Sequence, residues 1–382
     1  MKNFIKKYSL ILFESALILL SVVVIVIFQI LKGNKNICEW YSRNIGRWIQ
    51  TINGAIVKYI PFSIMETFFI LLFILVITLL VVSIIELVHK RIYNSFSSII
   101  MIPTLVLLVI ANYNAYCTLQ YNRKPVPLES YNGEVDEEKY EDIIQYFLDD
   151  FNYCSSQVTY RDNYEIKELY SLSKLNKIMQ KEYKRLNDEY FAPFTSNAKP
   201  MMSSFIYREM WITGVYFAPF GESNINVLST KSEIPYTLVH ELAHSKGIMR
   251  ENDANLVATY LTLTSDNPYI RYSGYINTFS YVLNIAHYSD DAALYNSLLN
   301  KVDNNIRKNW GYISKYWNSH NLANRIADWW NSLYLKSQGT ENGTDDYDDT
   351  PVIVDPDTHK VVTFSNFQKI YLGIYFANHP ES

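Results

Sequence analysis

The stretch that decides the fold of the polar part of the chain runs from Ser232 to Asn255 and reads SEIPYTLVHELAHSKGIMRENDAN. Ser232 can cap the N-terminus of a helix and Pro235 fits its first turn, so we expect a helix to begin here. His240 and His244 are four residues apart and lie on one face of that helix, where both imidazoles can reach one metal ion. The stretch therefore predicts a helix with two metal ligands; a surface helix with incidental histidines is the alternative interpretation.

The residues around the histidine pair fit a catalytic zinc site. Glu241 is displaced by about 100° around the helix from His240, beside the ion, where a base that activates a metal-bound water must lie. Gly247 follows His244 by three residues and can adopt the positive φ that lets the chain turn back sharply. A second helix then begins at Glu251, whose carboxylate would complete three protein ligands and leave a fourth position open.

Two acids compete for the position of the third ligand. Glu251 and Asp253 are two residues apart, about 200° around a helix, so both cannot face the same ion. Glu251 shares its face with Asn255, which could hydrogen-bond a ligand. We therefore predict Glu251 as the third ligand and keep Asp253 as the alternative.

This pattern resembles a known group of enzymes. His240-Glu241-Leu-Ala-His244, followed by Glu251-x-x-Ala254-Asn255, is similar to the gluzincin metallopeptidases, in which HExxH is followed by ExxA[DN]. The resemblance implies that His240, His244 and Glu251 bind zinc, that Glu241 is the base and that Asn255 supports a ligand. Only six residues separate His244 from Glu251, fewer than in the larger gluzincins, so the turn between the two helices must be very short.

The whole chain also resembles an uncharacterised bacterial membrane family, a family defined by a domain of unknown function. Its members combine about three N-terminal spans with a segment like Tyr216–Asn224 ahead of a HELAH helix, and Arg271–Tyr275 matches a second family segment. This resemblance implies a membrane protein of bacterial origin but no substrate.

Apolar residues are concentrated in the first 120 positions. Three runs predict transmembrane helices at about 9–31, 64–86 and 97–117, because a hydrocarbon core of roughly 30 Å needs about 20 apolar residues in a helix. Glu14 lies about one turn from the basic N-terminus, so we expect its carboxylate to extend to the headgroups. The basic N-terminus and the Lys90-Arg91 turn favour an extracytoplasmic position for the polar part of this multi-pass cell-membrane protein, although more cations lie on the other side of the spans.

An amphipathic helix is expected at about 37–60, between the first two spans. Its apolar and aromatic residues recur at steps of three and four: Ile37, Tyr41, Ile45, Trp48, Ile52, Ile56 and Tyr59. Such a helix can lie in the membrane interface or pack on the polar domain, and the pattern does not separate the two.

Outward from the motif, helical patterns dominate the polar part. Between Met210 and Ser229, aromatic and β-branched residues interrupted by Pro219 and Gly221 indicate two strands or a kinked edge strand. We expect helices at about 134–151, 164–191, 235–246, 251–264, 274–286, 290–304, 318–335 and 364–377.

The predicted fold class is membrane-anchored α+β: three N-terminal transmembrane helices, then a mostly helical zincin-like domain with a small β-sheet. Residues 1–120 form the anchor and residues 121–382 the metallohydrolase domain. With 34 basic and 38 acidic residues, the chain lacks the basic excess of a nucleic-acid-binding protein, so no nucleic-acid partner is expected. Its three cysteines are too few for a disulfide framework.

Two further elements bear on a peptide substrate. Zincins bind peptide along an edge strand beside the active helix, and Val215–Leu228 could supply this strand; an ordinary core strand is the alternative. Arg271, Tyr272 and Tyr275 follow the second motif helix and are candidate stabilisers of a transition-state oxyanion, or otherwise part of an aromatic packing segment.

The functional hypothesis is a membrane-anchored zinc metallopeptidase that hydrolyses peptide bonds with a zinc-bound water activated by Glu241. Its cofactor would be one zinc ion, and its partners the lipid bilayer and a peptide or protein substrate. The alternative is a non-hydrolytic, membrane-anchored binding or assembly protein that retains a zincin fold.

Overall fold

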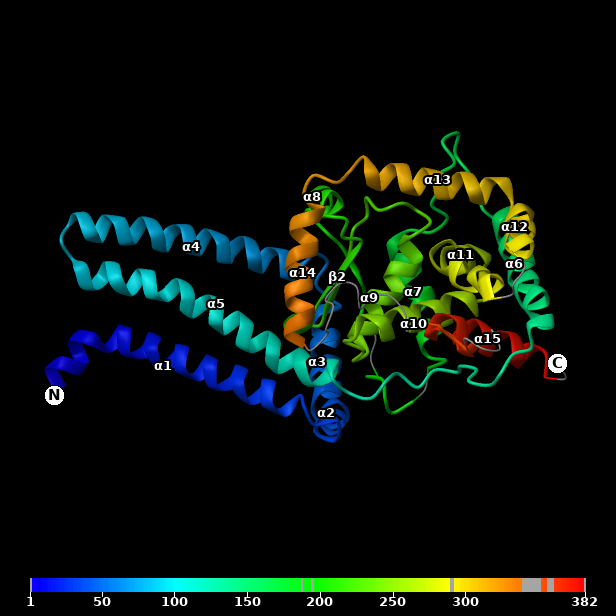
Figure 1. The fold of residues 1–382 in the computed structure, drawn as a ribbon. Helices are drawn as coiled ribbons and strands as arrows, with labels where there is room; N and C mark the ends of the chain where they lie inside the picture. The colour runs from blue at the N-terminus through cyan, green and yellow to red at the C-terminus, as the bar shows by residue number, and fades with distance from the viewer. Residues whose placement is uncertain are drawn as a thin grey trace.

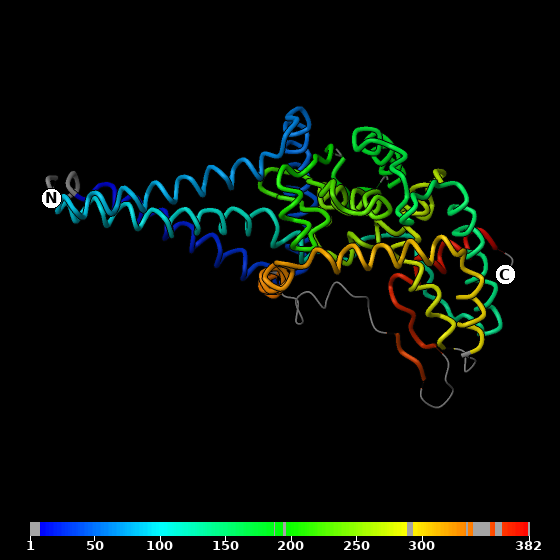
Figure 2. Tube along the Cα trace, turned by 90° about the horizontal axis from the view of Figure 1, so that it is seen from above, coloured from blue at the N-terminus to red at the C-terminus, as the bar shows by residue number. Residues whose placement is uncertain are grey.

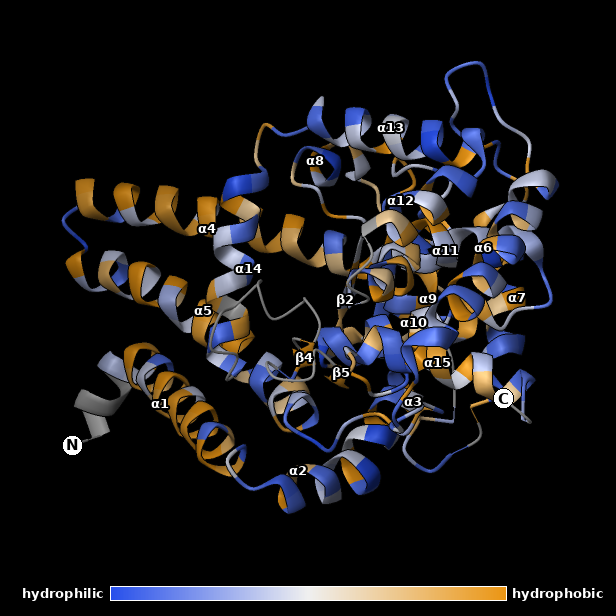
Figure 3. Cartoon of the chain, turned by 45° about the vertical axis from the view of Figure 1, so that its right-hand side comes forward, coloured by the Kyte–Doolittle hydropathy of each residue, from blue (hydrophilic) through white to orange (hydrophobic). Residues whose placement is uncertain are grey.

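Three long helices project side by side from one end of the molecule, away from the C-terminal helix (Figures 1 and 2). They are α1 (Lys2–Leu31), α4 (Ile64–Val88) and α5 (Ile92–Tyr121). All three are long and apolar enough to cross a membrane, which confirms the predicted spans in length and composition, and Figure 3 shows that hydrophobic residues predominate along them. The computed structural model describes residues 2–186, 188–193, 196–288, 292–338, 352–355 and 361–380.

The expectation that Glu14 extends to the headgroups is wrong. Its side chain is 0% exposed, and Ser97 Oγ of α5 donates a hydrogen bond of 2.7 Å to Glu14 Oε1. Because α1 packs along α5, the carboxylate faces the neighbouring helix, where a polar partner compensates in part for its burial.

The predicted amphipathic helix consists of α2 (Lys35–Tyr41), a π-helical turn η1 (Ser42–Gly46) and α3 (Arg47–Val57). Small and polar residues, not the apolar stripe, face the rest of the protein: a Cβ at Gly46 would clash with Gln120, and Gly221 lies against Gly54. Most of the predicted apolar stripe is exposed instead: Ile45, Trp48, Ile52, Ile56 and Tyr59. One face therefore packs on the end of α5 and on the polar domain, while the other remains available to a membrane interface.

The polar part is mostly helical around a small sheet, as predicted. Its helices are α6 (Tyr140–Gln157), α7 (Leu172–Tyr183), α8 (Ser204–Glu209), α9 (Ile234–Ser245), α10 (Glu251–Leu263), α11 (Pro268–Leu283), α12 (Ala292–Lys301), α13 (Asn304–Asn318), α14 (Asn324–Gln338) and α15 (Asn366–Asn378), with 3-10 turns η2 (Glu137–Lys139), η3 (Ala218–Phe220) and η4 (Asn284–Tyr288). Helix α9 lies at the centre, in contact with α10, α11 and the sheet.

Two of the helix predictions differ from the structure. Only α7 forms within the predicted 164–191 helix, because residues 160 and 166 pair as an antiparallel bridge ahead of it. The region 304–318, left between two predicted helices, forms α13, whose N-terminus is capped by Asp303.

The sheet has the strand order β1-β3-β2, with β1 (Lys199–Pro200) parallel to β3 (Glu222–Ile225) and β2 (Gly214–Phe217) antiparallel to it. The predicted two strands therefore exist, joined by a turn in which Gly221 has φ of 63°. Strand β2 is at the edge of this sheet. A separate hairpin joins β4 (Ile353–Val354) to β5 (Val361–Thr363).

The sheet also holds the start of a membrane helix. Glu222, which is 0% exposed, accepts hydrogen bonds from the backbone N–H groups of Ile64 and Met65 at 2.9 and 2.8 Å, and pairs with Lys199 Nζ at 2.9 Å. A carboxylate at the N-terminus of α4 satisfies unpaired N–H groups and complements the helix dipole. The anchor and the polar domain are thus joined by buried polar contacts.

Candidate metal centre

Helix α9 carries the histidine pair into the centre of the fold. Leu238, Val239 and Leu242 are completely buried on its other sides and fix its position in the core. The helix starts with Pro235 in its first turn, as predicted, but the N-cap position is Glu233 and has no side-chain cap. The expectation that Ser232 caps this helix is therefore wrong.

A tight turn returns the chain from α9 to α10. Gly247 has φ of 95°, the left-handed region in which glycine is favoured, as its position after His244 predicted. The turn brings the carbonyl oxygen of Ile248 to 2.6 Å from His244 Nδ1 and starts α10 at Glu251. Six residues are enough to bring the third acid to the histidines.

Three atoms of the kinds that ligate metal ions converge between α9 and α10. His240 Nε2 lies 3.1 Å from both His244 Nε2 and Glu251 Oε2, and His244 Nε2 lies 3.5 Å from Glu251 Oε2. Zinc bonds of roughly 2.0–2.1 Å at tetrahedral angles place neighbouring ligand atoms about 3.3 Å apart. The triangle has the size that one zinc ion requires, and His240, His244 and Glu251 form a group able to hold a metal ion.

The other ring nitrogens set the orientation of both imidazoles. His244 Nδ1 faces a carbonyl oxygen, which can only accept, so Nδ1 carries the proton and Nε2 of the neutral ring presents a lone pair. His240 Nδ1 lies 2.8 Å from Asn255 Oδ1, which places Asn255 in the supporting position expected of it. Two lone pairs and a carboxylate then face one point, an arrangement that a cation stabilises.

Without a metal, the charges compensate one another. Burial lowers the pKa of His244, but the adjacent Glu251 carboxylate outweighs it and raises this pKa to about 9. Burial opposes ionisation of Glu251 as well, yet the two histidines hold its pKa well below the ordinary value. Protonated imidazole thus takes the place of a cation, and metal binding must release that proton.

Glu241 is buried beside this cluster, on the side of strand β2. A Cβ at Gly214 would clash with the Glu241 carboxylate, so glycine at the start of β2 leaves room for it. Glu241 Oε2 is buried without a hydrogen-bond partner among the described residues. Burial raises the pKa of Glu241 to about 7, although His240 and His244 oppose the shift. The carboxyl can therefore gain or lose a proton near neutral pH.

Asp253, the alternative ligand, lies away from the triangle formed by His240, His244 and Glu251. Its Oδ2 is 3.8 Å from Arg250 Nε, and burial raises its pKa. The two acids of α10 thus point in different directions, as their separation around the helix predicts.

The candidate oxyanion stabilisers do not lie at the triangle of candidate metal ligands. The prediction that they serve this site is therefore corrected. Arg271 Nε and Tyr275 OH bond to Asp150 of α6 at 2.9 and 2.8 Å, and Tyr272 OH donates to Asn309 of α13 at 3.0 Å. These side chains belong to the aromatic core between α6, α11 and α13, where Phe151 stacks on Tyr275. These contacts agree with the alternative interpretation, in which the three residues belong to an aromatic packing segment.

Sequence reasoning missed residues that cover the histidines. The Tyr216 ring on β2 lies 5.8 Å from the His244 ring, and its buried hydroxyl has no hydrogen-bond partner among the residues described. Tyr216 clusters with Cys117 and Tyr121 at the end of α5 and with Leu335 of α14. The family resemblance of the segment that starts at Tyr216 was the available signal; the α5 and α14 contacts have no local signal in the sequence.

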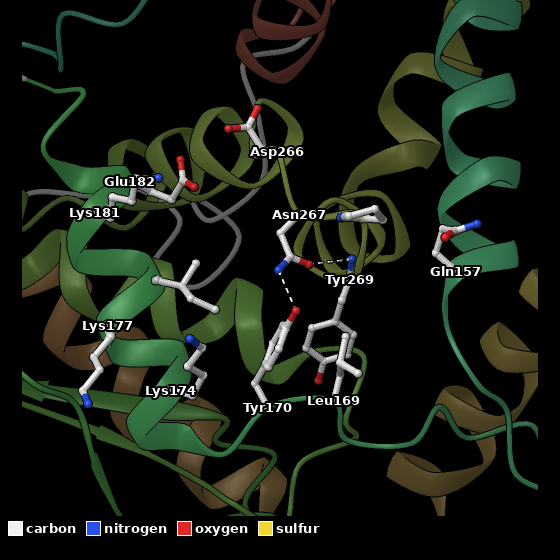
Figure 4. A pocket seen from close by; sticks show the side chains of 12 residues that line it. Gln157, Leu169, Tyr170, Lys174, Lys177, Lys181, Glu182, Asp266, Asn267 and Tyr269 are labelled. Atoms are coloured by element: carbon white, nitrogen blue, oxygen red, sulfur yellow. Dashed lines mark hydrogen bonds between the residues drawn. The ribbon is translucent and has the colours of Figure 1, made fainter.

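The domain also has a hollow away from the two histidines. It has a volume of about 610 Å³ between α7 and the start of α11. Figure 4 shows its lysine-rich wall on α7, and Asn267, which donates to Tyr170 OH and accepts from the Tyr269 N–H, both at 3.0 Å. None of the three candidate metal ligands lines this hollow.

Comparison with known proteins identifies the family. The family described as "Protein of unknown function (DUF3810)" matches residues 41–354, and the chain belongs to this family. No curated protein and no solved structure matches the chain significantly.

Proposed function

We propose that this member of the DUF3810 family is a membrane-anchored zinc metallopeptidase. The observation that carries the proposal is the convergence of His240, His244 and Glu251 at separations of 3.1–3.5 Å, beside the buried carboxylate of Glu241. Zincin-type chemistry needs these two components together: three protein ligands with a fourth position open, and a carboxylate that moves a proton.

The residues divide the chemistry as follows. Zinc bound to the three ligands would lower the pKa of a water molecule and polarise a substrate carbonyl. Glu241 accepts the proton of the attacking water and delivers it to the amine that leaves when the C–N bond breaks. Burial raises the pKa of Glu241, which favours its holding the proton between these two steps. Asn255 holds His240 in the orientation and tautomer that expose Nε2.

A peptide substrate would bind along strand β2. This strand pairs with β3 on one side, and no described strand pairs with its other edge. Main-chain hydrogen bonds to an edge strand bind extended peptides with little demand on sequence. Gly214 and Tyr216 face α9, so a peptide added beside β2 would pass close to Glu241 and His244. We place the domain on the extracytoplasmic side, from the basic N-terminus and the basic α4–α5 turn.

The test is metal content and turnover of the full chain in detergent, since buried contacts join anchor and domain. Wild type is expected to hold about one zinc per chain, retained by Glu241→Gln and Asp253→Asn and lost by His244→Ala. A labelled peptide library should be cleaved by wild type and not by Glu241→Gln.

Two results would overturn the proposal. A folded wild-type chain without zinc after metal loading and desalting excludes the metallopeptidase. Zinc bound equally by wild type and Glu241→Gln, with no cleavage by either, favours a membrane-anchored binding or assembly protein.

A further inference from the structure

A groove opens between α4 and α5 where these helices reach the polar domain. It has a volume of about 410 Å³ and is closed at its domain end by Phe217 and Phe220. Leucines form both walls: Leu72 and Leu75 on α4, and Leu105 and Leu108 on α5. The lining residues of α4 and α5 belong to two of the helices that are long and apolar enough to cross a membrane, so we expect the groove to face the hydrocarbon of the bilayer.

The size of the groove limits what can occupy it. The groove runs along about two turns of each helix, from Phe68 to Leu75 on α4 and from Leu105 to Asn112 on α5. A methylene group takes about as much space as a water molecule, roughly 30 Å³, so the groove holds about a dozen of them. This is the volume of one extended acyl chain.

One polar group distinguishes the groove from a plain lipid-facing surface. Asn112 of α5 lies at its domain end with an exposed side chain, and this amide has no hydrogen bond to another described residue. An unpaired amide in hydrocarbon is costly, and a carbonyl at the head of an acyl chain would satisfy it. The lining is therefore apolar along its length and hydrogen-bonding at one end.

The groove also adjoins the metal centre. Phe217, whose ring closes the groove, is the last residue of β2. Its neighbour Tyr216 packs on His244 from the opposite face of the strand. An acyl chain in the groove would therefore end at Phe217, and the adjacent residue, Tyr216, contacts the candidate metal ligand His244.

We propose that this groove binds the acyl chain of a lipid-modified peptide, with its carbonyl at Asn112 and its peptide part along β2. The peptide part of this inference rests on the proposed function; the acyl site does not. Lipid tails are as apolar as leucine, so contact with the groove walls cannot by itself select one chain from the bilayer. A phospholipid ester carbonyl can also accept from Asn112, so selection over phospholipid comes from the peptide part along β2.

The test is photolabelling of full-length Glu241→Gln in phosphatidylcholine nanodiscs. One probe is a short peptide with an N-terminal palmitoyl chain that carries a diazirine; the other is phosphatidylcholine with the same photoreactive chain. The acylated peptide is expected to label the groove segments of α4 and α5 at least five-fold more than the phospholipid probe does at equal amounts. Leu108→Trp, which fills the groove, should reduce this labelling several-fold, as should Leu72→Trp from the other wall and Asn112→Leu.

The matched control is Ile110→Trp, an exposed position on α5 outside the groove lining. Labelling of this control should equal that of the Glu241→Gln chain without a further substitution. Equal labelling by the two probes would show an ordinary phospholipid site and overturn the inference, as would equal effects of Leu108→Trp and Ile110→Trp. Photolabelling needs neither zinc nor turnover. Labelling of the groove in a protein that binds no zinc would refute the peptidase alone. Zinc binding and peptide cleavage without labelling of the groove would refute the acyl site alone.

Discussion

Replacing Glu39 by glutamine tests how the amphipathic helix is held to the end of α5. Arg123, which is 2% exposed, donates from Nη2 to Glu39 Oε1 at 2.9 Å and from Nε to Glu39 Oε2 at 3.2 Å. Arg43 Nε approaches Glu39 Oε1 at 2.6 Å. The guanidinium of Arg123 also lies 3.5 Å from the centre of the Tyr190 ring. Glu39 is the carboxylate that neutralises this buried cation.

The size of the effect follows from two arguments. Burial would raise the pKa of Glu39, but Arg123 and Arg43 overcome it and lower the pKa from 4.5 to about 2. At ~1.4 kcal/mol for each tenfold change in proton affinity, this stabilises the folded state by about 3 kcal/mol at neutral pH. Breaking a buried ion pair by removing one partner costs roughly 3–5 kcal/mol, the same range.

The pH dependence has a definite sign. A carboxyl with a lowered folded-state pKa contributes its full stabilisation above its unfolded pKa, and this contribution is lost as the pH falls through the folded value. The difference between wild type and Glu39→Gln should therefore be about 3 kcal/mol at pH 7 and shrink between about pH 4.5 and pH 2.

The assay is the free energy of unfolding of the full chain in mild detergent, from denaturant titrations at pH 7 and at acid pH. Glu189→Gln is the matched control, because Glu189 is also an acid beside Arg43, at 3.8 Å, but is 84% exposed. Its change should stay within ~0.5 kcal/mol. The reasoning fails if Glu39→Gln behaves like this control at pH 7, or if its deficit does not diminish in acid.

Three other predictions concern the metal centre and the junction. Asn255→Ala removes the partner of His240 Nδ1 and should weaken zinc binding by about 10–100-fold in a chelator competition; unchanged affinity would show that Asn255 does not orient the ligand. Gly214→Ala places a methyl group against the Glu241 carboxylate and should abolish peptide cleavage while zinc stays bound. Gly311→Ala, whose added methyl group meets open space, is the control. Full activity of the Gly214 variant would contradict the close contact between Gly214 and Glu241. Glu222→Gln leaves Lys199 buried without a counter-charge and should lower the free energy of unfolding by roughly 3–5 kcal/mol; a loss below ~1 kcal/mol would mean that this pair does not hold α4.

Features that depend on neighbours along the chain could be predicted from the order of the residues. The three spans follow from the length of the apolar runs, and the convergence of His240, His244 and Glu251 follows from a four-residue helical step and a glycine turn. These are short-range effects, since φ/ψ preferences and helical spacing act within a few residues. The separate directions of Glu251 and Asp253 could be predicted for the same reason.

Which surfaces meet depends on how the whole chain packs in three dimensions. The tertiary structure turned the small-residue face of the α2–α3 segment inward because Gly46 and Gly54 allow close approach, whereas apolar periodicity left the direction of each face open. It buried Glu14 against Ser97 and bonded Arg271 to Asp150, pairs that are 83 and 121 residues apart. Contacts over such separations depend on how whole helices pack, and neither residue spacing nor composition encodes them locally. The acyl-sized groove arises in the same way, because its walls belong to α4 and α5 and its end to β2 and η3.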